Sequence, residues 1–131
     1  MTTKLVFTGK THNTGGRNGG TRSQDGMLEL KLSQPHPAAE NLFGAAWSAC
    51  YIGAIELAAL QRKVKLPAGP EVETDINLNV DDGSYFLSAR LNVSLPGLDR
   101  DLAHEIIHAA HEICPYSKAT RGNIEVETNL V

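Results

Sequence analysis

One apolar segment decides how this chain folds: Leu42-Phe-Gly-Ala-Ala-Trp-Ser-Ala-Cys-Tyr-Ile-Gly-Ala-Ile-Glu-Leu-Ala-Ala-Leu60. Drawn as a helix, it is apolar almost all round, which is typical of an element at the centre of a domain. It is long enough to be tested as a membrane span, but it includes Glu56, Ser48, two glycines and many alanines. We therefore expect a buried helix from about Ala39 to about Arg62, in a protein without a membrane partner.

Length and composition narrow the other possibilities. The 131 residues, 41% of them hydrophobic, fit one compact domain over residues 1–131 that buries roughly two-thirds of its unfolded surface. The 12 basic and 15 acidic residues give a net charge of −3, without a Lys/Arg cluster, which argues against nucleic acid as a partner. The N-terminal sequence lacks the apolar core of a secretory signal, so we expect a reducing cytoplasm, where permanent disulfides are disfavoured.

Alternation of apolar and polar residues predicts two strands before the central helix. We expect them over Lys4–Thr8 and Met27–Leu32, with the loop Asn13–Arg22 between them. The two prolines of Ser33–Pro37 then break the second strand before the helix begins.

A hairpin, a second helix and a last strand follow the central helix. Val72–Val80 and Tyr85–Leu95 alternate well, and the Asp-Asp-Gly-Ser sequence between them is a strong hairpin signal. Asp99 is a suitable N-cap for the second helix, Pro115 ends it, and Ile124–Val131 alternates again as a strand. The order β-β-α-β-β-α-β indicates an α+β domain rather than a parallel α/β domain.

The chain has two cysteines, Cys50 in the apolar segment and Cys114 at the end of the second predicted helix. They are too far apart in sequence for a Cys-x-x-Cys redox motif or a paired zinc knuckle. A cysteine in an apolar helix is usually an inert core residue, and Cys114 is also read most simply as a core or boundary residue. If the two act together, the fold has to bring them together.

A reactive Cys50 would require an apolar substrate and a nearby cation. Phe43, Trp47 and other apolar residues fall on its side of the helix, so a substrate reaching the sulfur would be largely apolar. The thiolate is the nucleophile, and a cation lowers the thiol pKa from its free value of about 8.5. The glycine-flanked Arg17 is a candidate, although a mobile surface loop is the alternative for that segment. Cys114, at the negative end of a helix, suits a resolving thiol better than an attacking one.

A second motif competes with the cysteines. His104-Glu-Ile-Ile-His108 is a literal H-E-x-x-H on a predicted helix, a spacing that places two imidazoles around zinc with Glu105 as general base. His111 lies on the same face, and Cys114 could serve as a further ligand. These histidines fall opposite the apolar stripe of the helix, so a solvated face is the favoured interpretation and a zinc hydrolase is the alternative.

Four stretches together resemble the organic hydroperoxide resistance (Ohr) family of the wider OsmC/Ohr group. They are Thr14-Gly-Gly-Arg-Asn-Gly19, Ser23-Gln-Asp-Gly26, Glu40-Asn-Leu-Phe-Gly-Ala-Ala-Trp-Ser-Ala-Cys50 and Cys114-Pro-Tyr-Ser-Lys-Ala-Thr-Arg-Gly-Asn-Ile124. The last stretch is typical of the Ohr branch rather than the OsmC branch. The resemblance spans nearly the whole chain and implies antiparallel sheets around a buried central helix, in an intertwined homodimer.

The resemblance also implies an activity. It predicts a cytoplasmic, thiol-dependent peroxidase that reduces organic, especially fatty-acyl, hydroperoxides to alcohols. No bound cofactor is implied; a lipoylated protein or another dithiol would be the external reductant. Matched residue by residue, Cys50 corresponds to the peroxidatic Cys, Cys114 to the resolving Cys, and Arg17 and Glu40 to the pair that activates and positions the first sulfur. The alternatives are an OsmC-type peroxidase of broader specificity and a non-catalytic small-molecule binding module.

Helix geometry adds an expectation about assembly. On one continuous helix, Glu40 and Cys50 would be about 15 Å apart along the axis, too far to share Arg17 within one subunit. Either the helix begins after Glu40, or a second subunit completes the site. The small residues of this helix would let another backbone approach, so we expect a dimer with active sites at the interface.

Substrate selection is expected to depend on aromatic walls. Phe43, Trp47 and Tyr116 would favour bulky organic peroxides over hydrogen peroxide. The sequence departs from the family at Lys118, where many relatives have Asn, and in the short approach Ser33–Ala39, which would alter how that loop gates the substrate.

Overall fold

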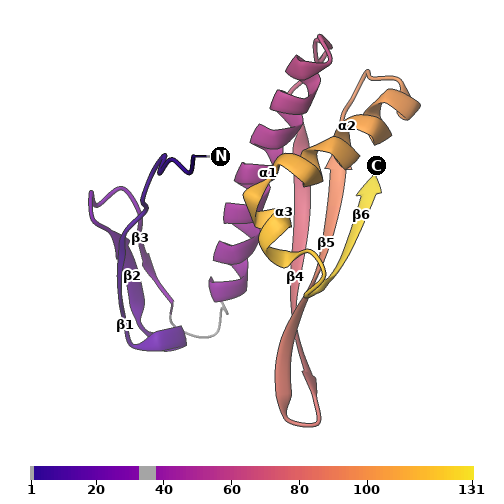
Figure 1. Ribbon diagram of the computed structural model, residues 1–131. Helices are drawn as coiled ribbons and strands as arrows, with labels where there is room; N and C mark the ends of the chain where they lie inside the picture. The colour runs from indigo at the N-terminus through magenta and orange to yellow at the C-terminus, as the bar shows by residue number, and fades with distance from the viewer. Residues whose placement is uncertain (1, 33–37) are drawn as a thin grey trace. The chain divides into compact units, whose positions relative to one another are not determined.

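The computed structural model describes residues 2–32 and 38–131, which belong to two compact units, Met1–Ala39 and Glu40–Val131 (Figure 1). The elements in chain order are β1 (Thr11–Thr14), a 3-10 helix (Gly16–Asn18), β2 (Gly20–Ser23), β3 (Glu29–Lys31), α1 (Ala38–Gln61), β4 (Glu71–Asp81), β5 (Ser84–Ser94), α2 (Arg100–Ile113), α3 (Pro115–Thr120) and β6 (Glu125–Leu130). The predicted break at Ser33–Pro37 lies outside the described residues.

The first unit contains a three-stranded antiparallel sheet in the order β1-β2-β3. The buried Thr21 on β2 donates its hydroxyl hydrogen to Asn13 Oδ1 on β1, at 2.6 Å. The β1–β2 connection requires glycine at both ends, because Gly15 has φ 73° and a Cβ at Gly19 would lie 1.6 Å from a backbone carbonyl oxygen. This connection places Arg17 in the 3-10 helix.

Two predictions for this unit are wrong. Lys4–Thr8 is not assigned as a strand, and its three large apolar side chains are 78%, 89% and 82% exposed. An alternating segment forms a strand only where another strand pairs with its backbone. The predicted loop Asn13–Arg22 instead holds the end of β1, the 3-10 helix and most of β2, while the predicted strand Met27–Leu32 is confirmed only as the shorter β3.

The second unit contains a three-stranded sheet in the order β4-β5-β6. β4 and β5 form the predicted antiparallel hairpin, closed by Asp82 at φ 49° and Gly83 at φ 78°, the positive φ values that a tight two-residue turn needs. β6 pairs parallel with β5, so this sheet is mixed and not antiparallel as predicted. Figure 1 shows the hairpin reaching well beyond the paired end of β6.

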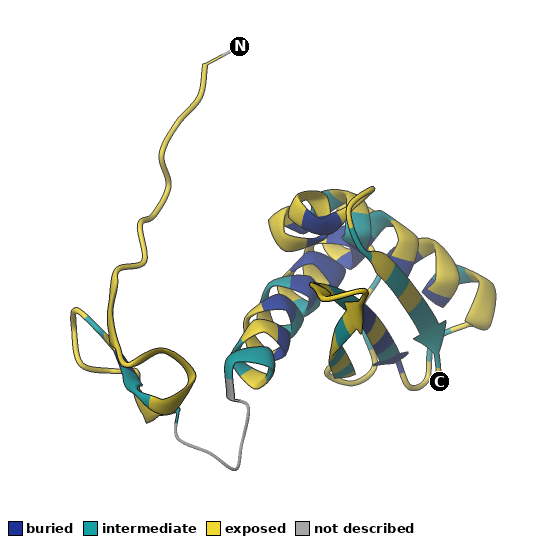
Figure 2. Ribbon diagram, turned by 90° about the horizontal axis from the view of Figure 1, so that it is seen from below, coloured by how far each residue is buried: buried dark blue, intermediate teal, exposed yellow. Residues whose placement is uncertain are grey.

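One face of this sheet carries the core. Its side chains align in rows across the strands: Val72–Val93–Leu130, Thr74–Leu91–Thr128 and Ile76–Ala89–Val126. α1 and α2 contribute the other core residues, and Figure 2 shows the buried sides of the helices and the sheet in one cluster. The largest fully buried side chains are Trp47, Tyr51, Ile55, Leu91, Ile106, Val93 and Cys114. The site described below lies in this core.

α1 is the predicted central helix, and its bounds agree with the prediction to within one residue. Trp47, Tyr51, Ile55 and Ala58 recur every three or four residues and are all 0% exposed. The opposite face is exposed and rich in small residues, including Ala45, Ala46, Ala49 and Gly53. By length and composition alone this helix could cross a membrane, but its large side chains pack into the core of the second unit, as expected of a buried helix.

The chain between α1 and β6 contains one helix that was not predicted. The Asp99 carboxylate accepts the backbone N–H of Leu102 at 3.2 Å, which confirms Asp99 as the N-cap of α2. Pro115 ends α2 as predicted, but it also begins α3, because its fixed φ and missing N–H suit the first position of a helix. Cys114 is therefore the single residue between two helices.

Candidate active site at two facing cysteines

The fold brings the two cysteines together, as it must if they act as a pair. Both are free thiols, and the Sγ atom of Cys114 donates a hydrogen bond to the Sγ atom of Cys50 at 3.2 Å. Cys50 is half-buried on α1, whereas Cys114 is 0% exposed between α2 and α3. One sulfur is therefore open to small molecules, and the other lies behind it.

The surroundings of Cys50 do not by themselves make it a thiolate. Burial raises its pKa above the ordinary value, and the hydrogen bond with Cys114 raises it further, while the backbone N–H of Tyr116 acts in the opposite direction. Burial disfavours the charged form, and only an opposite charge or more donors would reverse this. An attacking Cys50 needs a cation in addition to these neighbours.

The two predicted charged residues occupy different parts of the chain. Arg17 is in the 3-10 helix of the first unit, and Glu40 is in the first turn of α1. α1 runs without interruption from Ala38 to Gln61, so the alternative in which the helix begins after Glu40 is wrong. Ten residues of continuous helix place Glu40 and Cys50 about 15 Å apart along the axis. The structure thus places Cys50 in contact with Cys114, whereas Glu40 lies at the N-terminal end of α1, far from the Cys50 of the same chain.

The predicted aromatic residues differ in their exposure. The Trp47 side chain is 0% exposed, and Phe43 packs against it edge-on with 6.0 Å between ring centroids. Phe43 and Tyr116 are 37% and 44% exposed, so both reach the surface. Trp47 is therefore a core residue that also borders a cavity, while Phe43 and Tyr116 are the predicted aromatic side chains that reach the surface.

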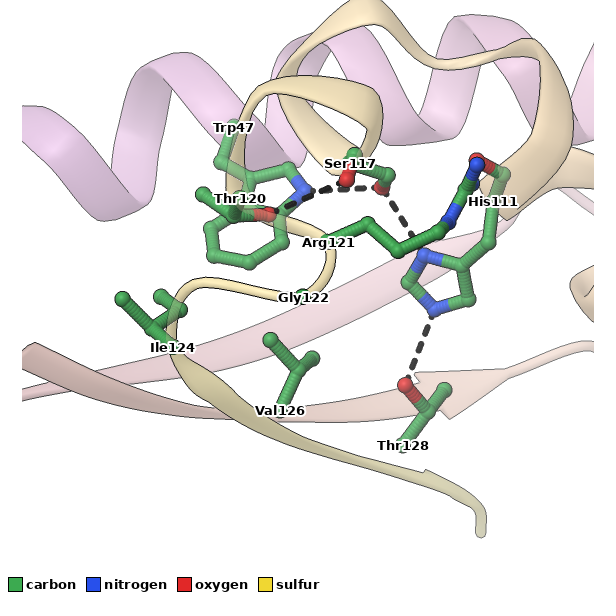
Figure 3. Close-up of a pocket in the computed structure, with 9 residues that line it drawn as sticks. All are labelled: Trp47, His111, Ser117, Thr120, Arg121, Gly122, Ile124, Val126 and Thr128. Carbon is green, nitrogen blue, oxygen red and sulfur yellow. Dashed lines mark hydrogen bonds between the residues drawn. The ribbon is translucent and has the colours of Figure 1, made fainter.

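A cavity of about 290 Å³ lies next to the cysteine-bearing elements (Figure 3). It is lined by Trp47, His111, Ser117, Thr120, Arg121, Gly122, Ile124, Val126 and Thr128. In Figure 3, Ser117 lies between the Trp47 indole and the His111 ring, and dashed lines join the three. Sequence reasoning did not identify Ser117 or Thr128 as part of a site, because each has its partner in a different element.

His111 is the centre of this hydrogen-bond network. Its Nδ1 atom lies 2.8 Å from Ser117 Oγ and its Nε2 atom 2.9 Å from Thr128 Oγ1. The ring also stacks on Tyr51, with 4.4 Å between centroids. Burial, followed by the nearby charges of Arg121 and His108, lowers the pKa of His111 to about 4. The ring is neutral at physiological pH, so each nitrogen has a defined donor or acceptor role.

The residues of the H-E-x-x-H motif do not converge on a common site in the structure. His104 and His108 are exposed, as expected of a solvated face, but the expectation is wrong for His111, which is half-buried. Glu105 forms an ion pair with Arg62 at 2.7 Å, linking α2 to the end of α1. Within residues 2–32 and 38–131, no group of three His, Cys, Asp or Glu side chains converges as a metal site. The zinc hydrolase alternative has no support in this geometry.

Comparison with known proteins agrees with the fold and the sequence motifs. The family model described as OsmC-like protein matches residues 32–129. The organic hydroperoxide resistance protein of Xanthomonas axonopodis pv. citri is 35% identical over 136 residues, covering 97% of this chain and 96% of its own length.

Solved structures of relatives have the same fold. The crystal structure of the organic hydroperoxide resistance protein OhrB of Bacillus subtilis has a TM-score of 0.88 at 39% identity and covers 97% of this chain and 100% of its own. That of an organic hydroperoxide resistance protein from Elizabethkingia anophelis also has a TM-score of 0.88, at 33% identity, and covers 98% of both chains. The chain thus belongs to the OsmC/Ohr family, in its organic hydroperoxide resistance branch, whose function is of the peroxidase type.

Proposed function

We propose that this protein is a thiol peroxidase that reduces organic hydroperoxides to alcohols, with Cys50 as the attacking residue. The single observation that carries the proposal is the 3.2 Å contact between a half-buried and a fully buried thiol in this family's fold. The Cys50 thiolate attacks the distal peroxide oxygen, the O–O bond breaks, and the alkoxide takes up a proton and leaves as the alcohol. Cys50 becomes a sulfenic acid.

Cys114 completes the oxidative half of the cycle. Its thiolate attacks the Cys50 sulfur, the S–S bond forms, the S–O bond breaks, and the hydroxyl leaves as water with the proton that Cys114 gave up. A disulfide needs about 2.05 Å between its sulfurs, so the 3.2 Å contact requires only a small approach. An external dithiol of the lipoyl type, such as a lipoylated protein in the cytoplasm, then reduces the disulfide and is itself oxidised. The cycle needs no bound cofactor.

Arg17 is the cation that the Cys50 site requires. A guanidinium beside the sulfur would offset the burial that raises the Cys50 pKa and would stabilise the charge that develops as the O–O bond breaks. Glu40 would hold Arg17 in place through a two-point carboxylate–guanidinium contact. These roles rest on the sequence match and on the need for a cation.

A homodimer accounts for the distance between Glu40 and Cys50, because a second chain can bring its own Glu40 to the first chain's sulfur. Two exposed surfaces support this assembly. The small-residue face of α1 allows close approach of another helix. The β4–β5 hairpin also continues the core-facing rows beyond β6, where Leu78, Val80 and Tyr85 are 47%, 60% and 72% exposed. Apolar surface of this kind is characteristic of an interface.

Mixed dimers test this sharing directly. Neither Glu40→Ala nor Cys50→Ser should be active as a homodimer. If the site is shared, random pairing in an equal mixture makes about half of the dimers mixed, each with one complete site of two, so about a quarter of the wild-type activity returns. If each chain forms its own site, no dimer has a complete site, the mixture stays inactive, and the shared arrangement is excluded.

Organic peroxides fit the site better than hydrogen peroxide does. Phe43 and Tyr116 give an apolar approach to the half-buried sulfur, and burial of a hydrocarbon chain adds about 25 cal/mol per Å². Fatty-acyl hydroperoxides have the longest such chains among common peroxides. We therefore expect kcat/KM for a long-chain organic hydroperoxide to exceed that for hydrogen peroxide by several orders of magnitude.

Counting free thiols tests the central proposal. The reduced protein is treated with one equivalent of cumene hydroperoxide and examined by intact mass spectrometry, for wild type and for Cys114→Ser. The expected products are an intramolecular Cys50–Cys114 disulfide in wild type and a Cys50 sulfenic acid in the variant. Two unreacted thiols in the wild-type protein would overturn the peroxidase assignment.

A further inference from the structure

Cys114 has an unusual backbone position. It is both the last cap of α2 and the first cap of α3, with φ −65° and ψ 119°. Its N–H donates to the Ala110 carbonyl at 2.8 Å, and its own carbonyl accepts the Lys118 N–H at 3.1 Å. The direction of the Cys114 side chain therefore depends on the angle between two helices that meet at this single residue.

A hydrogen bond between two side chains crosses this junction, in addition to the contact of the Arg121 guanidinium with the His111 carbonyl at 2.6 Å. His111 lies three residues before Cys114 in the last turn of α2, and Ser117 lies three residues after it in the first turn of α3. Their side chains meet across the junction, with 2.8 Å between His111 Nδ1 and Ser117 Oγ. Ser117 is only 4% exposed, so water competes little for this contact.

The same pair is attached to α1 on both sides of Cys50. Trp47 donates its Nε1–H to Ser117 Oγ at 3.1 Å, and Tyr51 stacks on the His111 ring at 4.4 Å. These residues stand three before and one after Cys50 in the same helix. A His111–Ser117 unit thus touches both the helix that carries the first sulfur and the junction that carries the second.

The protons in this network can be assigned from its donors. The indole N–H of Trp47 is only a donor, so Ser117 Oγ accepts it and can direct its own hydrogen to His111 Nδ1. The neutral ring then carries its hydrogen on Nε2, which donates to Thr128 Oγ1 on β6. The lowered pKa of His111 keeps the ring in this neutral state.

We propose that His111 and Ser117 are positioning residues for the resolving step, and that their contact holds Cys114 in line with Cys50. We call this pair the His111–Ser117 clamp. The inference rests on the proposed peroxidase cycle and extends it to residues that do not touch the peroxide. Its physical basis is proximity, since a displacement of about 1 Å can lower the rate of an intramolecular reaction about 100-fold.

The clamp predicts that the two chemical steps respond differently to its loss. In Ser117→Ala, we expect disulfide formation to slow by about 10- to 100-fold. Attack of Cys50 on cumene hydroperoxide should stay within about twofold of wild type, because the uninterrupted helix α1 keeps Cys50 in place when the helix loses its contact with Ser117. Rapid quenching with a sulfenic acid trap and mass spectrometry gives both rates, and the sulfenic acid should accumulate in the variant.

Matched variants separate positioning from general damage. Thr120→Val removes another buried hydroxyl of α3, one that donates only to the backbone carbonyls of Tyr116 and Ser117, and it should resolve at close to the wild-type rate. Ser117→Thr keeps the hydroxyl beside a cavity with room for one methyl group, so it should restore the rate lost in Ser117→Ala. A purely structural role would affect Thr120→Val and Ser117→Ala alike.

A peroxide-independent assay keeps this inference separate from the proposed function. Dipyridyl disulfide first forms a mixed disulfide with the half-buried Cys50, releasing one thiopyridone. Cys114 then attacks the Cys50 sulfur and releases the second thiopyridone. The clamp predicts that only the second release slows in Ser117→Ala, even if the wild-type protein proves inert to hydroperoxides.

The proposal is overturned if the second release and the resolving step both run at the wild-type rate in Ser117→Ala. Equal slowing in Thr120→Val would overturn it as well. Should Ser117→Ala fail to fold, Thr128→Val removes the Nε2 partner from β6 with almost no change in volume. It should then slow the second release, and a wild-type rate in that variant would count against the clamp.

Discussion

The indole nitrogen of Trp47 and the hydroxyl oxygen of Ser117 are joined by a buried hydrogen bond of 3.1 Å, although 70 positions of sequence separate them. The bond connects α1, which carries Cys50, to α3, whose N-cap is Cys114. Trp47 thus acts as both a core side chain and a polar link. Its two roles can be separated by substitution.

Trp47→Phe keeps an aromatic ring but removes the N–H and leaves space in the core. We expect the free energy of unfolding to fall by about 2–4 kcal/mol, from the lost hydrogen bond and the cavity together. Urea denaturation followed by circular dichroism measures the change. Phe43→Leu, at a position 37% exposed, should cost less than about 1.5 kcal/mol. Equal losses in the two variants would contradict the core role of Trp47.

Cys114→Ser should separate attack from resolution. We expect the first turnover with an organic hydroperoxide to proceed at close to the wild-type rate, and multiple turnover with a dithiol to fall at least about tenfold. With excess peroxide, the unresolved Cys50 sulfenic acid should continue to the sulfinic acid, which mass spectrometry detects. Cys50→Ser should show no peroxide-dependent oxidation at Cys114. Oxidation of Cys114 in that variant would reverse the assigned roles.

Arg17→Ala should raise the pKa of Cys50, because the proposed site would lose the cation that stabilises the thiolate. The pH at which Cys50 becomes half-alkylated by iodoacetamide is expected to move upward by about one to three pH units, and peroxide reduction at neutral pH should slow accordingly. Arg22→Ala, on the exposed surface of β2, is the matched control and should leave the alkylation profile in place. An unchanged profile in Arg17→Ala would remove Arg17 from the site.

His111 should make the protein less stable in mild acid. Its pKa is about 4 in the folded protein, whereas an unfolded chain has a histidine pKa of about 6.5. The unfolded chain therefore binds the proton first as the pH falls. This contribution to the free energy of unfolding is present above about pH 6.5, decreases as the pH falls towards 4, and levels off below that value.

Urea unfolding midpoints measured between pH 4 and 7 test whether the free energy of unfolding falls with pH as predicted. The stability difference between wild type and His111→Gln should narrow as the pH falls, because the variant lacks the titrating group. The exposed His104→Gln is the control for replacing a histidine of α2 outside the buried network, and it should change the free energy of unfolding at neutral pH less than His111→Gln does. Parallel curves for wild type and His111→Gln would show that His111 does not titrate in this way.

The sequence predicts the elements whose patterns are local. α1 and the β4–β5 hairpin are recognisable because helical and alternating periods repeat over many residues and because Asp82-Gly83 fits a tight turn. The pairing of β6 was missed, since its own pattern is the same for parallel and antiparallel neighbours. α3 was missed because Pro115 is both a stop signal for one helix and a good first residue for the next.

The candidate site was predictable only in part. The two cysteines stand in stretches that identify the family, and the structure shows them in contact. His111 was assigned to a solvated face because the helical wheel of α2 alone cannot show that Thr128 and Ser117 cover it. Buried polar networks depend on residues from several elements, so their members cannot be recognised from the period of any single one.

The complete burial of Cys114 decides which sulfur the reductant attacks in the proposed cycle. If the disulfide forms as proposed, an incoming thiol would reach only the half-buried Cys50 sulfur, since Cys114 is 0% exposed. The mixed disulfide with the reductant must then form on Cys50, with Cys114 as the departing thiolate. The second thiol of a dithiol can release Cys50 without leaving its first partner, whereas a monothiol must wait for another molecule to arrive. In the proposed cycle, the buried position of Cys114 is thus a physical reason to expect that dithiols reduce the protein faster than monothiols do.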